Sequence, residues 1–174
     1  MTQMSALETA SAIRTGQTSV IEVVEDALDR AHADECHAWS WIDDEGARHT
    51  AQELQRKLDE GEVEPGPLFG VPCPIKDLYA LAGAPRPLGS RAIGGQPSEA
   101  DDGIVALLKA AGTVPIGTTT APEFGLPCYT EPAGRAPTAT PWDLARMSGG
   151  SSGGAAAAVG DGQVPIAQGS DGGG

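Results

Sequence analysis

The sequence predicts an α/β fold, in which helices pack against a sheet that contains parallel strands. Two stretches support this prediction. A helical pattern at residues 101–111 stands between extended apolar segments at 74–78 and 113–117, and this order is typical of parallel strands joined by a crossover helix. Near the end of the chain, an alanine run at 155–158 predicts a small-residue helix that can bury against a sheet, and the apolar residues 164–167 then predict a further strand.

Two helix-capping patterns open the chain. Ser5 with Glu8 has the pattern of a capping box and begins a short helix that Gly16 can close. Ser19 with Glu22 repeats the pattern at the start of a longer helix, whose valine, leucine and alanine residues recur at helical spacing. We therefore expect two amphipathic helices that turn their carboxylates to water and one apolar stripe inward.

Residues 1–64 are expected to form an N-terminal helical segment that packs on a core made by residues 65–174. Within the first segment, residues 39–42 predict a strand or a packed loop. Thr50 to Leu58 predict a third helix, with Thr50 and the glutamate three residues later as its cap. A charged, turn-rich connector at residues 60–67 joins the two parts.

Lys76 lies in the stretch VPCPIKDLY, where the two prolines that precede it disfavour a helix and hold the chain extended. Farther along, Asp101 and Asp102 are predicted to cap a helix that Gly112 ends, and Thr113 then begins the next strand. The lysine is thus expected on an inner strand of the core.

Two serines, Ser151 and Ser152, lie in a glycine-lined turn, GGSSGG. A serine hydroxyl in water is a poor nucleophile and needs a base. Lys76 is the better candidate for that base, because desolvation by its apolar neighbours lowers the pKa of a lysine and can leave it neutral near pH 7. The histidines all lie in the acidic N-terminal segment: His32, His37 and His49.

Two acidic residues adjoin these motifs. Asp77 follows Lys76 directly, and Asp171 lies in a second glycine-lined turn, GSDGGG. Either could serve as a catalytic carboxylate, but we expect both to hold turns and helix N-termini by accepting hydrogen bonds from backbone amides.

Composition limits the class of function. The chain has 174 residues, of which 24 are acidic and 11 are lysine or arginine, for a formal net charge of −13. Such acidity argues against nucleic-acid binding, which needs a basic face. No apolar run is long enough for a membrane span, and no basic start precedes an apolar run, so a cytoplasmic protein is expected. The widely spaced Cys36, Cys73 and Cys128 predict neither a zinc site nor a disulfide framework.

The motifs together resemble the amidase signature family of serine hydrolases. GPLFGVPCPIKD, then APEF, PWD, GGSSGG and GSDGGG occur in the order and spacing of that family, from about Gly66 to the last residue. The resemblance implies the amidase signature fold, a mixed twisted β-sheet flanked by helices on both faces. It also implies that this sequence is only the N-terminal portion, so that residues 65–174 would be the first, incomplete part of the core.

The resemblance implies an amidase that cleaves the carbon–nitrogen bond of carboxylic amides through a Ser-Ser-Lys triad and an acyl-enzyme, with no metal or cofactor. Lys76 matches the base, and Ser151 matches the bridging serine, which in the family follows a cis peptide bond. Gly172, Gly173 and Gly174 match positions whose backbone amides form the oxyanion hole. The nucleophilic serine of the family follows directly, so the sequence is expected to be an incomplete record that ends just before its nucleophile.

The resemblance also indicates substrate-binding residues. Gly125 matches a position that lines the acyl pocket, where a glycine would leave room for a bulky or aromatic acyl group, and Ser151 is expected to contact the substrate as well. Residues 118–120 are all threonine, whereas family members often have lysine, threonine and asparagine there. The departure affects the expected hydrogen bonding near the site but not the lysine and serine positions.

Two other functions stay open at this point. The family includes the transfer-RNA amidotransferase subunit that releases ammonia from glutamine together with partner subunits. A glycine turn that opens a helix is also an anion site, so a non-catalytic, glycine-rich anion-binding protein is a third hypothesis, although the chain lacks the GK[ST] and GxGxxG patterns of nucleotide sites. The expected partner is a small-molecule amide, and a homodimer is an assembly that the sequence leaves open.

Overall fold

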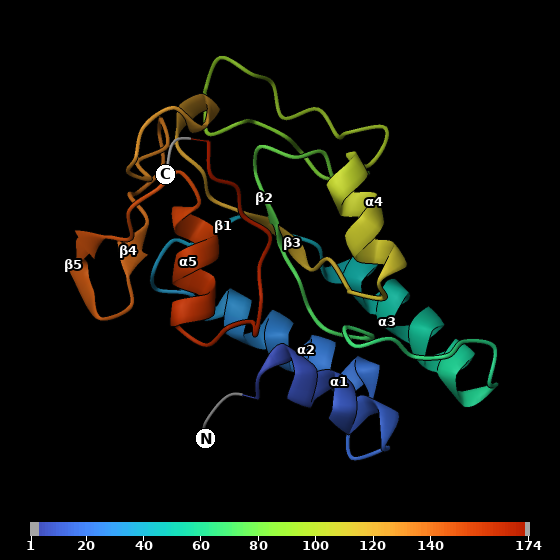
Figure 1. Ribbon diagram of the computed structural model, residues 1–174. Coiled ribbons are helices and arrows are strands. Elements are labelled where there is room, and N and C mark those ends of the chain that lie inside the picture. Colours follow the sequence, from blue (N-terminus) through green and yellow to red (C-terminus); the bar gives the residue numbers. More distant parts are fainter. Residues whose placement is uncertain (1–3, 173–174) are drawn as a thin grey trace.

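The computed structural model describes residues 4–172. Its central sheet is covered by helix α5 on one side and by α4 on the other, with the N-terminal helices α1 and α2 packed beneath (Figure 1). In chain order the elements are α1 (Ala6–Arg14), α2 (Val20–His32), β1 (Trp39–Ile42), α3 (Asp44–Asp59), β2 (Ile75–Lys76), α4 (Gly103–Ala110), β3 (Gly117–Thr119), the 3-10 helix η1 (Glu123–Gly125), β4 (Ala139–Thr140), β5 (Asp143–Met147) and α5 (Gly153–Gly160).

Both predicted capping boxes are present. The Ser5 hydroxyl accepts from the backbone N–H of Glu8, whose carboxylate accepts in return from the Ser5 backbone, and Ser19 with Glu22 does the same at α2. Each box satisfies two backbone donors that a helix start otherwise leaves unpaired. The apolar stripe of α2 is buried in the main core, as its spacing predicts.

Helix α3 begins earlier than predicted. The prediction placed its start at Thr50, but the helix begins at Asp44, and Asp43 caps it by accepting from the Gly46 amide. Thr50 lies inside the helix, and its hydroxyl donates to the Gly46 carbonyl. Asp43 is available because strand β1 ends directly before it, and the buried side chain of Ala47 extends the apolar stripe into the additional turn.

The central sheet has the strand order β1-β3-β2. Strand β2 pairs parallel to β3, with Ile75 opposite Thr118 and Lys76 opposite Thr119, while β1 pairs antiparallel to β3. The parallel pair with α4 between its strands confirms the predicted crossover. Residues 39–42, which the sequence left as a strand or a packed loop, form the edge strand β1.

Three local predictions in the core are wrong. The strand expected at residues 113–117 starts at Gly117, because the residues before it contribute only an isolated parallel bridge from Val114 to Pro72. Residues 164–167 form no regular strand. Asp101 and Asp102 do not cap α4 with their side chains, because these carboxylates accept instead from the backbone amides of the loop at residues 80–82.

The main hydrophobic core joins both parts of the chain. Buried residues of α2 and α3 contact those of α5 and of the segment that leads into β3, and partly buried Trp39 and Ile42 of β1 pack against them. A second, smaller cluster packs Val105 of α4 on Ile75 of β2, so the two faces of this strand have different neighbours. No helix within residues 4–172 is both long and apolar enough to cross a bilayer. The boundary at residue 64 stays a prediction.

Helix α5 can approach the sheet closely because its first turn lacks side chains. A Cβ atom on Gly154 would overlap the backbone of Thr120 and the carbonyl of Ala38, and the Gly154 amide donates to the Thr120 carbonyl at 3.1 Å. The turn that carries Ser151 and Ser152 is thereby held against the end of β3.

Gly154→Ala should destabilise the protein by more than about 2 kcal/mol, since backbone atoms rather than flexible side chains occupy the space of the new methyl group. The matched control is Gly160→Ala at the other end of the same helix, where a Cβ would crowd the tip of the exposed Trp142 ring, which can move, and would touch the Pro141 side chain at an ordinary contact distance. At that position the usual helix preference for alanine over glycine, about 1 kcal/mol, should offset the free-energy cost of the contact. Urea unfolding of both variants measures the difference, and similar losses would contradict the assignment.

Candidate active site

A cavity of about 740 Å³ opens where three loops meet. Its walls come from the loop at residues 125–128, the glycine turn at 148–153 and the segment 170–172. Ser151, Ser152 and Ser170 contribute hydroxyls to it, and Leu126 contributes apolar surface. The cavity therefore has the size and mixed lining of a small-molecule site.

Lys76, at the end of strand β2, has an exposed fraction of 0% and contacts two residues that line this cavity, Ser151 and Ser170. Its Nζ is 2.7 Å from Ser151 Oγ, 2.9 Å from Ser170 Oγ and 3.5 Å from the Ser170 carbonyl oxygen. Burial lowers the pKa of the Lys76 amine, and the negative charge of Asp171 opposes that shift in part. Hydroxyl and carbonyl oxygens surround the amine, and it is the burial of the amine that favours its uncharged form.

The backbone around Lys76 is held on both edges. On one edge, the strand pairs with β3, and the amide of Asp77 donates to the Thr119 carbonyl at 3.0 Å. On the other edge, the Lys76 amide donates to Gln168 Oε1 at 3.0 Å, and the Gln168 amide donates to the Pro74 carbonyl at 2.9 Å. A short strand of two residues is thereby fixed as firmly as a longer one would be.

Ser151 follows a cis peptide bond from Gly150, as the resemblance implies. It stands two residues before the first residue of α5, so the turn places its hydroxyl over the Lys76 amine. The structure brings these two predicted site residues together. Their catalytic roles stay a prediction.

Two further hydroxyls belong to the site, and the sequence analysis assigned neither a role. Ser170 contacts the Lys76 amine through both its hydroxyl and its carbonyl. Ser152 Oγ donates to the Ser170 carbonyl at 2.9 Å and accepts from the Ser170 amide at 3.0 Å, which fixes the backbone of that segment. The available signal was a serine in each glycine-lined turn, because two turns that meet at one amine bring all their hydroxyls to it.

The predicted substrate-binding and oxyanion-hole glycines are only partly described. Gly125 lines the cavity with a positive φ of 68°, and a Cβ there would overlap the Leu78 side chain, so the chain needs glycine at this position. Gly172 also lines the cavity. Gly173 and Gly174 lie outside the described residues.

The two acidic residues differ in position. Asp171 lines the cavity and acts on Lys76 through its charge. Asp77 lines a separate, smaller cavity and accepts from the Gly89 amide at 3.1 Å, which is the backbone contact expected for it.

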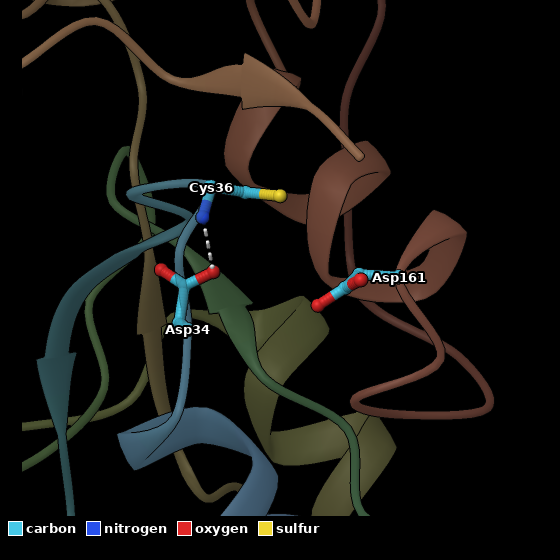
Figure 2. A group of neighbouring side chains, drawn as sticks. All are labelled: Asp34, Cys36 and Asp161. Atoms are coloured by element: carbon cyan, nitrogen blue, oxygen red, sulfur yellow. Dashed lines mark hydrogen bonds between the residues drawn. The ribbon is translucent and has the colours of Figure 1, made fainter. Parts of the chain in front are cut away.

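One group of residues could hold a metal ion within the described part of the chain: Asp34, Cys36 and Asp161, whose ligand atoms lie within 4.8 Å of one another. Figure 2 shows the Cys36 amide donating to Asp34, with Asp161 facing them from the end of α5. The Gln163 amide already bridges the two carboxylates at 2.8 Å each. Burial, together with the charges of these acids, raises the pKa of the Cys36 thiol to about 11, whereas a metal ligand must be a thiolate. Hydrogen bonding to Gln163 therefore accounts for the cluster.

Comparison with known proteins places this geometry in context. Residues 22–174 match the model of the family described as Amidase. The chain is 42% identical over 176 residues to a glutamyl-tRNA(Gln) amidotransferase subunit from Salinispora arenicola, a match that covers 100% of this chain and 36% of that protein. The chain spans about a third of the length of the curated relatives it matches.

Two solved structures have the same arrangement of elements. One is a bacterial aryl acylamidase of the amidase signature family, with a TM-score of 0.89 and 33% identity over 95% of this chain and 35% of that one. The other belongs to work on a vestigial protein complex and the origins of an s-triazine catabolic enzyme. Its TM-score is 0.91, with 37% identity over 97% of this chain and 37% of that one.

The three cysteines should differ in reactivity. Cys128 is exposed at the cavity wall, whereas Cys36 and Cys73 are buried, and burial raises the pKa of each buried thiol to about 11. Iodoacetamide at pH 8 should therefore modify Cys128 in the native protein and the other two only after denaturation. Peptide mass spectrometry measures the sites, with Cys128→Ser as the control. Equal modification of Cys73 in the native state would contradict the described packing.

Proposed function

This chain belongs to the amidase family, and we propose on that basis that the full-length protein hydrolyses carboxylic amides with Lys76 as its base. The aryl acylamidase and the other amidase structures that it resembles have the same fold, which confirms the predicted amidase signature class. The observation that carries the proposal is the 2.7 Å separation between the buried Lys76 amine and the Ser151 hydroxyl beneath a large cavity.

The hydrogen bonds of the amine are compatible with its proposed role as a base. A neutral lysine has two N–H donors and one lone pair. If both donors are directed at Ser170, to its hydroxyl and its carbonyl oxygen, the lone pair is left for the proton of Ser151. Because a protonated amine has no lone pair, the lowered pKa of Lys76 is a requirement of this arrangement.

We infer the following proton path. Lys76 takes a proton from Ser151, and Ser151 takes one from a nucleophilic serine that follows Gly174 in the full-length protein. That serine attacks the amide carbonyl, the backbone amides of Gly172, Gly173 and Gly174 stabilise the oxyanion, and the proton returns through Ser151 to the leaving amine. Each oxyanion donor in such a site contributes roughly 10²- to 10³-fold in rate. Water then releases the acyl group from the serine.

The acyl pocket is proposed to lie beside Gly125. The neighbouring Leu126 lines the cavity with an exposed fraction of 84%, so this wall offers apolar surface to a substrate. A bulky or aromatic acyl group fits such a wall.

A second candidate function rests on the relative from Salinispora arenicola, whose name is that of an amidotransferase component. In that case the full-length protein would release ammonia from glutamine only when its partner subunits are present. Assays of the purified protein with an aryl amide and with glutamine, each with and without partner subunits, separate the two functions. Turnover of the aryl amide by the protein alone supports the hydrolase.

Lys76→Ala in the full-length protein should lower amide turnover by about 10²- to 10⁴-fold, because both the base and the proton for the leaving amine are lost. Turnover of activated esters should fall less, since their leaving groups need no proton. Steady-state rates on a matched amide and ester measure the two losses. The control is Lys109→Ala, which removes a lysine of helix α4 that forms an ion pair with Asp101. Equal losses on amide and ester would contradict a proton-donating role.

Ser170→Ala should lower kcat for amides by about 10- to 100-fold, the size of one hydrogen bond to a charged or reacting group. The Michaelis constant should change little, because Ser170 acts on the lysine rather than on the substrate. Ser170→Thr keeps the hydroxyl and should recover most of the rate. A variant Ser170→Ala with unchanged kcat would show that the lysine needs no second acceptor.

A further inference from the structure

A buried carboxylate lies directly beside the base, and the proposed proton path does not use it. Asp77 follows Lys76, and successive side chains of an extended chain point to opposite faces, so Asp77 is directed away from the large cavity. Its exposed fraction is 1%. It lines a separate cavity of about 30 Å³ that shares no lining residue with the larger one.

The contacts of Asp77 join three parts of the fold. Its Oδ2 accepts from the Ser40 hydroxyl of strand β1 at 3.3 Å and from the Gly89 amide at 3.1 Å. Arg135 approaches from a third segment, where its Nη1 donates to the Ser40 carbonyl at 2.9 Å. The Gly89 backbone comes this close only because it is glycine, since a Cβ there would overlap the carbonyl of Ala121 just after β3. The carboxylate therefore lies where segments from β1, β2 and β3 meet.

The second oxygen of Asp77 indicates what the small cavity binds. Within residues 4–172, Oδ1 has no hydrogen-bond donor, although it is buried. The cavity beside it is lined by the polar side chains of Ser40, Ser90 and Thr120 and by the Arg135 cation. A space of this size and polarity fits one water molecule, which can donate to Oδ1. The positive charge of Arg135 disfavours a metal cation in the same place.

The charge on Asp77 is costly to the fold. Burial raises the pKa of its carboxyl to about 6, against the opposing effects of the Gly89 and Ser40 hydrogen bonds, the nearby Leu88 backbone and the Arg135 charge. Because this pKa lies above that of the unfolded chain, the folded protein binds the extra proton between about pH 4 and 6, and stability falls as the pH rises through that interval. At neutral pH the folded protein thus contains a buried ionised carboxylate, which costs more folding free energy than a neutral side chain would cost at the same position.

We propose that Asp77 is a positioning residue for Lys76: with Ser40, Gly89 and one bound water, its ionised carboxylate fixes the end of strand β2 and so holds the lysine amine against Ser151. This inference rests on the proposed function. Other charged groups near the cluster are Lys76 on the opposite face and Glu123, which accepts from Ser90 at 2.6 Å. A shift of the strand end by about 1 Å would separate the amine from its partner, and such displacements cost about 100-fold in rate.

The test uses Asp77→Asn in the full-length protein. It should lower kcat for amides by about 10- to 100-fold with a nearly unchanged KM. In the wild type, protonation of Asp77 adds to that of Lys76, so log(kcat/KM) against pH should be steeper than a slope of 1 over about one to two pH units below pH 6, whereas the variant should keep a slope of 1. Asp102→Asn is the matched control, because its carboxylate accepts from the nearby Ala80 amide but has no contact with the cluster.

A milder variant tests the proposal in case Asp77→Asn does not fold. Ser40→Ala removes one donor to the ionised carboxylate, which should raise the pKa of Asp77 and move the acid limb of the profile to higher pH. Wild-type rates and an unchanged limb in both variants would overturn the proposal. Equal loss of rate in Asp102→Asn, with the wild-type slope kept in all three variants, would mean that Asp77 only stabilises the fold.

A readout that needs no turnover separates this inference from the proposed function. The amine of Lys76 can be followed by NMR in lysine-labelled protein and assigned by its loss in Lys76→Arg. If the wild type hydrolyses no amide, the proposed function fails, but a Lys76 titration that changes in Asp77→Asn and not in Asp102→Asn still supports positioning. An identical titration in all three proteins overturns it.

Discussion

The contact between a buried amine and a hydroxyl is the constraint on which the rest of this structure depends. Lys76 Nζ and Ser151 Oγ lie 2.7 Å apart, yet they are 75 residues apart in sequence and belong to a strand and to a turn before a helix. The proposed role of this contact requires an uncharged amine, and exclusion of water lowers the pKa of the amine and so favours that form. The fold therefore has to meet two demands at once, the position of the turn and the dryness of the strand.

Small residues set the position of the turn, and the sheet excludes water from the strand. Gly154 lets α5 rest on the backbone at Thr120, so the turn with Ser151 is set by main-chain contact rather than by side-chain packing. Strand β2 is closed by β3 on one edge and by Gln168 on the other. The Ser152 hydroxyl fixes the Ser170 backbone, which supplies the acceptors around the amine. The turn with Ser151, the segment with Ser170 and strand β3 thus surround Lys76.

Local sequence signals were sufficient for part of the prediction. Contacts between distant segments decide the features that it missed. Capping boxes such as Ser5 with Glu8 are complete within four residues, so their pattern was sufficient. The α/β class and the meeting of Lys76 with Ser151 followed from element order and from the family resemblance. The start of α3 and the roles of Asp101 and Asp102 were missed, because competing partners such as Asp43 and the amides at 80–82 decide them. Ser170 was missed because only the folded chain brings the two turns together.

Burial shifts the pKa values of Lys76 and Asp77 in opposite directions, and in both cases it favours the uncharged form. Desolvation disfavours charge, so it lowers the pKa of the amine and raises that of the carboxyl. For the lysine this shift supplies the neutral form that a base requires. For the aspartate it is only a cost, unless the carboxylate accepts the donors that Ser40 and Gly89 direct at it. Two adjacent ionisable residues, one in a two-residue strand and the other directly after it, would be poor choices for stability alone. The proposed roles, proton transfer for Lys76 and a fixed strand end through Asp77, would account for their arrangement.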